Sequence, residues 1–169
     1  MKVLIAGVGN VLRRDDGFGV EVARRLQEMS LPPDVVVVET GIAGIALVQE
    51  LQDGWDALVV VDAVDHGRAP GTVMFIEPEV LDVNTVSFER RHDLLADMHL
   101  ATPELAMMLA RALGVLPANV VLVGCQIAEP DAVGEGLTPP VAAAVEIAVL
   151  EVLRYVEELT GVGSTGAPA

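Results

Sequence analysis

Apolar runs rich in valine recur along this chain and alternate with segments of helical periodicity. The expected strands are residues 2–8, 34–39, 57–64, 72–76 and 119–127. Uninterrupted apolar runs of this length are typical of parallel strands buried on both faces, and their alternation with helices favours a layered arrangement. We therefore expect an α/β fold of three layers, a twisted, mainly parallel sheet with helices on both faces.

The helical segments have start and stop signals as well as periodicity. The expected helices are residues 15–29, 44–52, 102–113 and 139–159. Thr102 lies in a capping position, Pro103 follows it, and Gly114 comes directly after that helix. Residues 78–97 are polar and irregular, and we expect them to be mostly loop. Residues 1–160 are expected to form a single α/β domain, and residues 161–169 a flexible tail.

Composition limits the partners of the chain. Of its 169 residues, 52% are apolar but only 3% are aromatic, so aliphatic side chains must build the core. The formal net charge of −15 argues against nucleic acid or an anionic membrane as partners, because both attract clustered lysine and arginine. A cation or a basic protein surface fits this charge better, although acidity also favours solubility by itself.

Cysteine usage and the absence of targeting segments predict the compartment. Cys125 is the single cysteine, so no disulfide can form within the chain. The first strand starts at once, without a signal peptide, and no apolar run approaches the ~20 residues of a membrane helix. We therefore expect a protein of the reducing cytoplasm.

Two adjacent carboxylates, Asp15 and Asp16, follow the first strand, where a nucleotide-binding loop would have glycine. The Gly-x-Gly at residues 7–9 begins a dinucleotide-binding pattern, and Glu39 lies where a ribose-binding acid would lie. The third glycine of that pattern is replaced by Leu12. Two carboxylates would also repel a pyrophosphate and attract a cation. A nucleotide-binding Rossmann-like enzyme is therefore a minor alternative to a metal or peptide site.

Side chains able to bind a metal follow two strands at the carboxyl edge of the expected sheet. Asp16 follows the first strand and Asp62 ends the third, and these two strands are commonly neighbours. His99 precedes the helix at 102–113 and can reach the same edge. Two carboxylates and one imidazole suit a borderline divalent ion such as nickel or zinc, with water or substrate in the remaining positions.

These residues also have structural interpretations. Asp16 could cap a helix, and His99 could be a cap or a surface group. His92 is a rival ligand, whereas His66 is the least suitable of the three histidines. Cys125 is expected to be a small core residue. The chain has neither a Gly-x-Ser-x-Gly segment nor a Cys–His pair fixed by spacing, so a serine or cysteine protease mechanism has no support.

Four segments together resemble the hydrogenase maturation proteases. They are GVGNVLRRDDGFGV at 7–20, VDAVDHG at 61–67, HLATPELAMMLARALG at 99–114 and GLTPPV at 136–141. The first segment is the most specific, and the likeness extends to about residue 155. The resemblance implies a peptidase domain that removes the C-terminal extension of the precursor of a [NiFe]-hydrogenase large subunit.

The resemblance also implies a role for the acidic edge. Nickel supplied by the substrate protein would be recognised by Asp16, Asp62 and His99, with Asp16 and Asp62 as the catalytic residues; zinc or cadmium could occupy the site in vitro. Either the metal polarises the scissile carbonyl or activates water, or one carboxylate acts as general base. A non-catalytic metal-binding maturation chaperone that uses the same crevice is the alternative.

Overall fold

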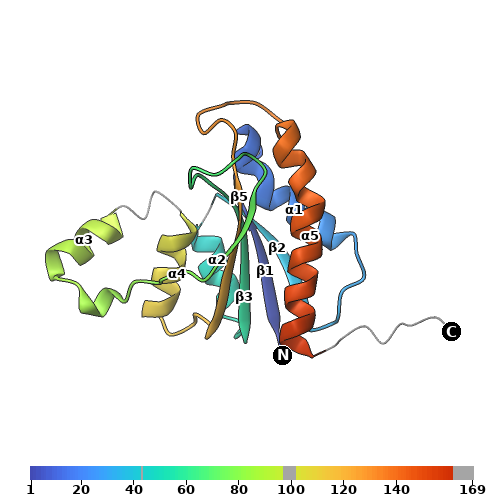
Figure 1. The fold of residues 1–169 in the computed structure, drawn as a ribbon. Helices are drawn as coiled ribbons and strands as arrows, with labels where there is room; N and C mark the ends of the chain where they lie inside the picture. The colour runs from blue at the N-terminus through green and yellow to red at the C-terminus, as the bar shows by residue number, and fades with distance from the viewer. Residues whose placement is uncertain (43, 97–101, 162–169) are drawn as a thin grey trace.

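The strands form one five-stranded sheet (Figure 1). The valine and leucine side chains of its central strands are buried. The structure is a computed structural model that describes residues 1–42, 44–96 and 102–161. The strand order is β2-β1-β3-β5-β4. The strands are β1 (Val3–Val8), β2 (Val35–Gly41), β3 (Ala57–Val64), β4 (Val73–Ile76) and β5 (Asn119–Gln126). All pairs are parallel except β4 with β5, which confirms the predicted mainly parallel sheet.

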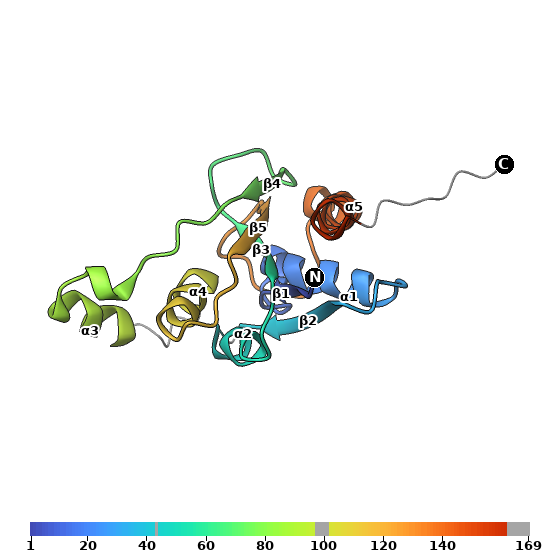
Figure 2. The same cartoon turned by 90° about the horizontal axis from the view of Figure 1, so that it is seen from below.

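Helices cover both faces of the sheet, as Figure 2 shows. The helical elements are η1 (Arg14–Gly17), α1 (Phe18–Gln27), α2 (Gly44–Leu51), η2 (Val83–Thr85), α3 (Phe88–Ala96), α4 (Pro103–Ala112) and α5 (Pro139–Thr160). Helices α1 and α5 pack on one face and α2 and α4 on the other. The three layers expected from the sequence are therefore present.

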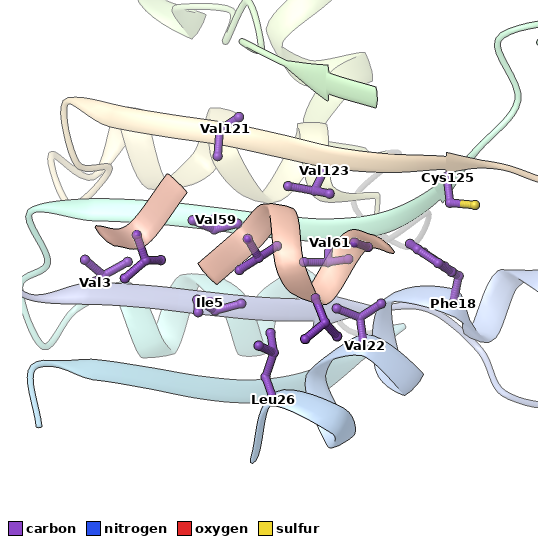
Figure 3. Close-up of a cluster of buried hydrophobic side chains, with 14 of the residues drawn as sticks. Val3, Ile5, Phe18, Val22, Leu26, Val59, Val61, Val121, Val123 and Cys125 are labelled. Carbon is purple, nitrogen blue, oxygen red and sulfur yellow. The ribbon is translucent and has the colours of Figure 1, made fainter. Parts of the chain in front are cut away.

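Alternation along the strands sends side chains to both helical layers. In β3, Val59 and Val61 face α1 and α5, whereas Leu58 and Val60 face α2 and α4. Figure 3 shows the first of these clusters, in which Phe18 lies near the carboxyl ends of the strands. Burial on both faces explains why these strands read as continuous apolar runs.

The register fixes which residues emerge together at the carboxyl edge. Gly7 of β1 is paired with Val61 of β3, so the residues that follow each of them leave the sheet side by side. The chain also changes direction here, because β2 lies on one side of β1 and β3 on the other. In open parallel sheets, such a switch point is where ligands usually bind.

Two segments differ from the sequence-based expectation. The helix expected at 15–29 is divided into η1 and a shorter α1, and Met29 lies beyond its end. Residues 78–97 were expected to be mostly loop, but they contain η2 and α3. Helix α3 lies beyond α4, away from the sheet (Figures 1 and 2). Five of its nine residues are charged or histidine, so this stretch of sequence resembles a polar loop.

The C-terminal boundary remains a prediction. Helix α5 ends at Thr160, and Gly161 adopts the left-handed conformation that commonly ends a helix. The expected tail at 161–169 lies outside the described residues after Gly161. Across the described ranges, no helix is both long enough and apolar enough to cross a membrane.

Candidate active site

The turn after β1 holds the carboxylate of Asp16 in one position. The Asn10 N–H donates to Asp16 Oδ2 at 2.9 Å, and the Asp16 N–H donates to the Arg13 carbonyl at 3.1 Å. Gly9 has a φ of 144° and passes so close that a Cβ there would lie 1.9 Å from the Asp16 carbonyl oxygen. The tight turn therefore places Asp16 above the end of β1.

Helix α1 begins after this turn and lies directly against the strands. Its N-cap is Gly17, without a side-chain cap bond, so the alternative reading of Asp16 as a helix cap is wrong. A Cβ on Gly19 would lie 2.1 Å from the Val61 carbonyl oxygen and 2.3 Å from that of Val8. Gly19 thus allows α1 to pack closely against the strands. In a dinucleotide-binding pattern the third glycine has this role, and in this chain Leu12 occupies that position.

Asp62 lies at the end of β3, next to the Asp16 turn. Its Oδ1 accepts a hydrogen bond of 2.8 Å from the Ala63 N–H, and the side chain is half-buried. Burial raises the pKa of Asp62 well above its usual range. The Ala63 N–H opposes this rise, and the negative charges of Asp16 and Glu104 add to it. The two predicted carboxylates therefore lie at the same carboxyl edge of the sheet.

The predicted histidines are placed differently. His99 lies outside the described residues. His92 is exposed on α3, which lies beyond α4 from the sheet (Figure 1). His66 is exposed in the turn after β3, where its backbone N–H donates to Gln126 Oε1 at 2.8 Å. Within residues 1–42, 44–96 and 102–161, no three His, Cys, Asp or Glu side chains are grouped closely enough to hold a metal ion.

Glu104 is an acidic neighbour of the site that the sequence reasoning missed. It is exposed in the first turn of α4, and its charge acts on Asp62. Thr102 caps the same helix, as predicted, with its Oγ1 accepting from the Leu105 N–H. A carboxylate in the first turn of a helix commonly stabilises the helix. The local sequence therefore does not reveal that Glu104 also acts on Asp62.

Asp15 has a structural role that was also missed. Its side chain is 1% exposed. Oδ1 accepts from the Thr138 N–H at 2.7 Å, and Oδ2 accepts from the Ala128 N–H at 2.9 Å. The Thr138 hydroxyl contacts both oxygens at 2.9 Å. The carboxylate therefore ties both ends of the loop between β5 and α5 to the turn that carries Asp16.

Gln126 organises the turn after β3. It is buried, and its Oε1 accepts from the backbone N–H groups of His66 and Arg68, at 2.8 and 3.2 Å. Its Nε2 donates to Asp65 Oδ1 at 3.0 Å. Asp65 is thus held by a residue of β5, a partner that only the tertiary structure reveals.

Cys125 is a core residue, as predicted. It is fully buried at the end of β5 (Figure 3). Burial raises the pKa of its thiol to about 12, and the charge of Asp15 adds to the rise. The thiolate is the nucleophilic form, so this residue is unreactive at neutral pH.

Comparison with known proteins gives a consistent result. The family model for hydrogenase maturation protease, HycI, matches residues 20–155. The chain is 34% identical over 154 residues to the hydrogenase expression/formation protein HupD of Rhodobacter capsulatus, covering 90% of this chain and 70% of HupD. It is 37% identical over 157 residues to HupM of Azotobacter chroococcum, covering 92% and 72%.

Solved structures agree with these sequence matches. The hydrogenase maturating endopeptidase HybD from E. coli superposes with a TM-score of 0.72 at 30% identity, covering 94% of this chain and 93% of HybD. The hydrogenase 2 maturation peptidase from Thaumarchaeota archaeon SCGC_AB-539-E09 gives 0.66 at 33% identity, covering 92% and 98%. By fold and by sequence over most of its length, the chain belongs to the hydrogenase maturation protease family.

Proposed function

We propose that this chain removes the C-terminal extension of the nickel-loaded large subunit of a [NiFe] hydrogenase. In this proposal, Asp16, Asp62 and His99 complete the coordination of nickel that the precursor already holds. Asp16 and Asp62 are also the catalytic residues. The metal enters with the substrate, so the enzyme cuts only a precursor that has received its nickel.

The pair of carboxylates at the switch point supports this proposal most strongly. Asp16 and Asp62 are each fixed by a backbone N–H, and burial together with neighbouring acids disfavours the charged form of Asp62. A divalent cation would favour the ionised form of both carboxylates and would therefore lower the raised pKa of Asp62. We therefore expect metal binding to release a proton from Asp62.

The donor set fits a borderline divalent ion. Carboxylate oxygens and an imidazole nitrogen suit nickel, and zinc or cadmium could take the same place in vitro. When bound, the metal would supply Lewis acidity at the scissile carbonyl. One of the two carboxylates, once ionised, accepts a proton from the attacking water.

The test uses a nickel-loaded precursor and mass spectrometry. Wild-type protein should release a C-terminal peptide, whereas Asp16→Asn and Asp62→Asn should each leave the precursor at full mass while retaining a folded spectrum. Asp131→Asn is the matched control, since Asp131 is exposed in the loop before α5. Normal processing by both site variants would refute the assignment. Nickel-dependent binding without any cleavage would favour the maturation chaperone instead.

We also place the activity in the cytoplasm. The chain has a single cysteine and therefore no internal disulfide, which fits a compartment where thiols stay reduced. In this proposal the precursor receives its nickel before the extension is removed, so we expect the enzyme in the compartment where the nickel is inserted. Fractionation of cells that express the tagged chain would check this placement.

A further inference from the structure

A cavity of about 200 Å³ lies between α4, α3 and the segment that follows β4. Most of its wall is aliphatic and consists of Val80, Leu81, Leu94, Leu105, Met107 and Met108. For comparison, an apolar cavity of about 150 Å³ in a protein core holds one benzene molecule. The space therefore suits a single side chain rather than a larger ligand.

The cavity lies on the side of the sheet toward which Asp62 points. Side chains alternate along β3, so Asp62 points to the same side as Val60 and Val64. Val60 and Val64 pack in the cluster that includes Met107 and Val80, two residues of the cavity wall. The cavity is therefore a neighbour of Asp62 on the side that α2 and α4 cover.

Two glutamates give this cavity an acidic mouth. Glu79 and Glu104 line the cavity and are exposed, whereas Met107 and Met108 are buried. Glu104 is in the first turn of α4, and because α4 leads into the start of β5, this turn lies toward the carboxyl edge (Figure 1). The cavity is thus apolar at its base and negatively charged where it opens to solvent.

The basic side chains of the neighbouring elements leave the acidic mouth unpaired among the described residues. Arg111 of α4 donates to the Val80 backbone carbonyl and pairs with Asp82 at 3.9 Å. Arg90 and Arg91 are on α3, but neither of them lines the cavity. Two carboxylates are therefore available to a cation from outside, in a chain whose net charge of −15 attracts basic partners.

We propose that this cavity binds one basic side chain of the precursor, next to the nickel that Asp16 and Asp62 recognise. The aliphatic stem of the side chain packs against the leucine and methionine side chains of the base, and its charged head pairs with Glu79 and Glu104. This inference rests on the proposed function, because that function places the metal of the precursor beside Asp62. The bound side chain fixes the position of the precursor relative to the two carboxylates.

The charge of the occupant is tested at Glu79, because the acids whose charges act on Asp62 are Asp16 and Glu104. Glu79→Gln should raise KM for a nickel-loaded precursor about threefold with kcat unchanged, and Glu79→Lys about tenfold or more. Glu157→Gln, at an exposed position of α5, is the matched control and should leave KM unchanged. A wild-type KM in Glu79→Lys would overturn the proposal.

An exchange of charges identifies the partner residue. Each basic residue of the precursor near its nickel ligands is changed to glutamate in turn. The variant that has lost the occupant should bind the wild type weakly and should bind Glu79→Lys more tightly than the unchanged precursor does. If no such variant recovers binding to Glu79→Lys, the proposal is wrong.

Filling the base of the cavity tests its occupancy. Leu105→Trp places an indole in the cavity, and Leu113→Trp is the matched control at an exposed position just after α4. Leu105→Trp should raise KM about tenfold, and Leu113→Trp should leave it unchanged. Equal KM values in the two variants would contradict the proposal. If Leu105→Trp weakens binding and the Glu79 variants do not, the occupant is apolar and the proposal is also wrong.

A binding measurement separates this inference from the proposed function. Nickel-loaded precursor is immobilised, and the affinities of the wild type and of Glu79→Lys are measured whether or not cleavage occurs. Weaker binding by Glu79→Lys supports the cavity even if no precursor is cut. Equal binding, or no binding by the wild type, refutes the cavity, and cleavage of the precursor by the wild type would then leave the protease assignment intact.

Discussion

Asp62 is a residue whose surroundings oppose its charge. Burial and the neighbouring acids Asp16 and Glu104 disfavour the carboxylate, and one N–H bond from Ala63 offsets this only in part. Such an arrangement costs stability in the metal-free protein, and it is typical of groups retained for binding or catalysis. The cost should therefore disappear when the charge is removed.

We predict that Asp62→Asn stabilises the metal-free protein. The amide oxygen can keep the bond from the Ala63 N–H, while the unfavourable negative charge is lost. The free energy of unfolding should rise by about 0.5–2 kcal/mol, the range of single stabilising changes. Urea unfolding measures it, with Asp131→Asn as the exposed control. A clear loss of stability in Asp62→Asn would contradict the assigned environment.

The same carboxyl predicts a pH dependence. The pKa of Asp62 in the folded state is raised above its unfolded value of ~3.9, so the folded state holds the proton longer. The contribution of Asp62 to stability is therefore fully present below that unfolded pKa and is lost as pH rises through the folded pKa. The stability advantage of Asp62→Asn should grow with pH above ~4 and then level off. Paired urea titrations across pH would show this, and an advantage that shrinks with pH would contradict it.

At the level of elements, Asp15 fixes the loop between β5 and α5. Both of its oxygens accept a backbone N–H, from Thr138 and from Ala128. An asparagine would have to turn its NH₂ group toward one of these donors in either orientation. Asp15→Asn should therefore cost about 1.5–3 kcal/mol, and Thr138→Val, which removes only the hydroxyl, about 1 kcal/mol. Thermal and urea unfolding would test the order, and equal stability of Asp15→Asn and wild type would refute this role.

The sequence predicts the elements that have an apolar face and misses one that does not. Strand β3 has the predicted bounds, and α4 starts after the predicted cap, Thr102. Helix α3 was not predicted, because five of its nine residues are charged or histidine and it lies away from the sheet. A short segment made mostly of charged side chains is easily taken for a polar loop, even when it forms a helix.

Topology alone predicts that the two candidate carboxylates lie at one edge of the sheet. Asp16 follows β1 and Asp62 lies near the end of β3, and the βαβ pattern makes these strands neighbours. The partner of Asp15 is 123 residues away in sequence, and no local pattern identifies it. Gln126 likewise has no distinctive sequence context at its strand end. Its role is visible only in the fold, where it accepts hydrogen bonds from the turn at residues 65–68.

For the whole molecule, the order of the strands positions the two candidate carboxylates. The chain leaves β1 toward β2 and returns to place β3 on the other side, so the ends of β1 and β3 border an open crevice. Helices α1 and α5 cover one face of the sheet beside these strand ends, and α2 and α4 cover the other (Figure 2).

The net charge of −15 predicts how salt affects stability. Self-repulsion at this charge disfavours the compact state, and salt screens it, with a Debye length of about 10 Å at 0.1 M. Salt also weakens the ion pairs, but those among the described residues are largely exposed, and exposed pairs add little to stability. Sodium chloride should therefore raise Tm.

A charge-reduced variant provides the control for this prediction. Glu129→Gln with Asp131→Asn removes two exposed negative charges, which changes the formal net charge from −15 to −13. Its Tm should exceed that of the wild type at low salt, and the two should converge as sodium chloride increases. Scanning calorimetry at several salt concentrations measures both curves. A Tm that falls with salt in both proteins would mean that the surface ion pairs outweigh the repulsion.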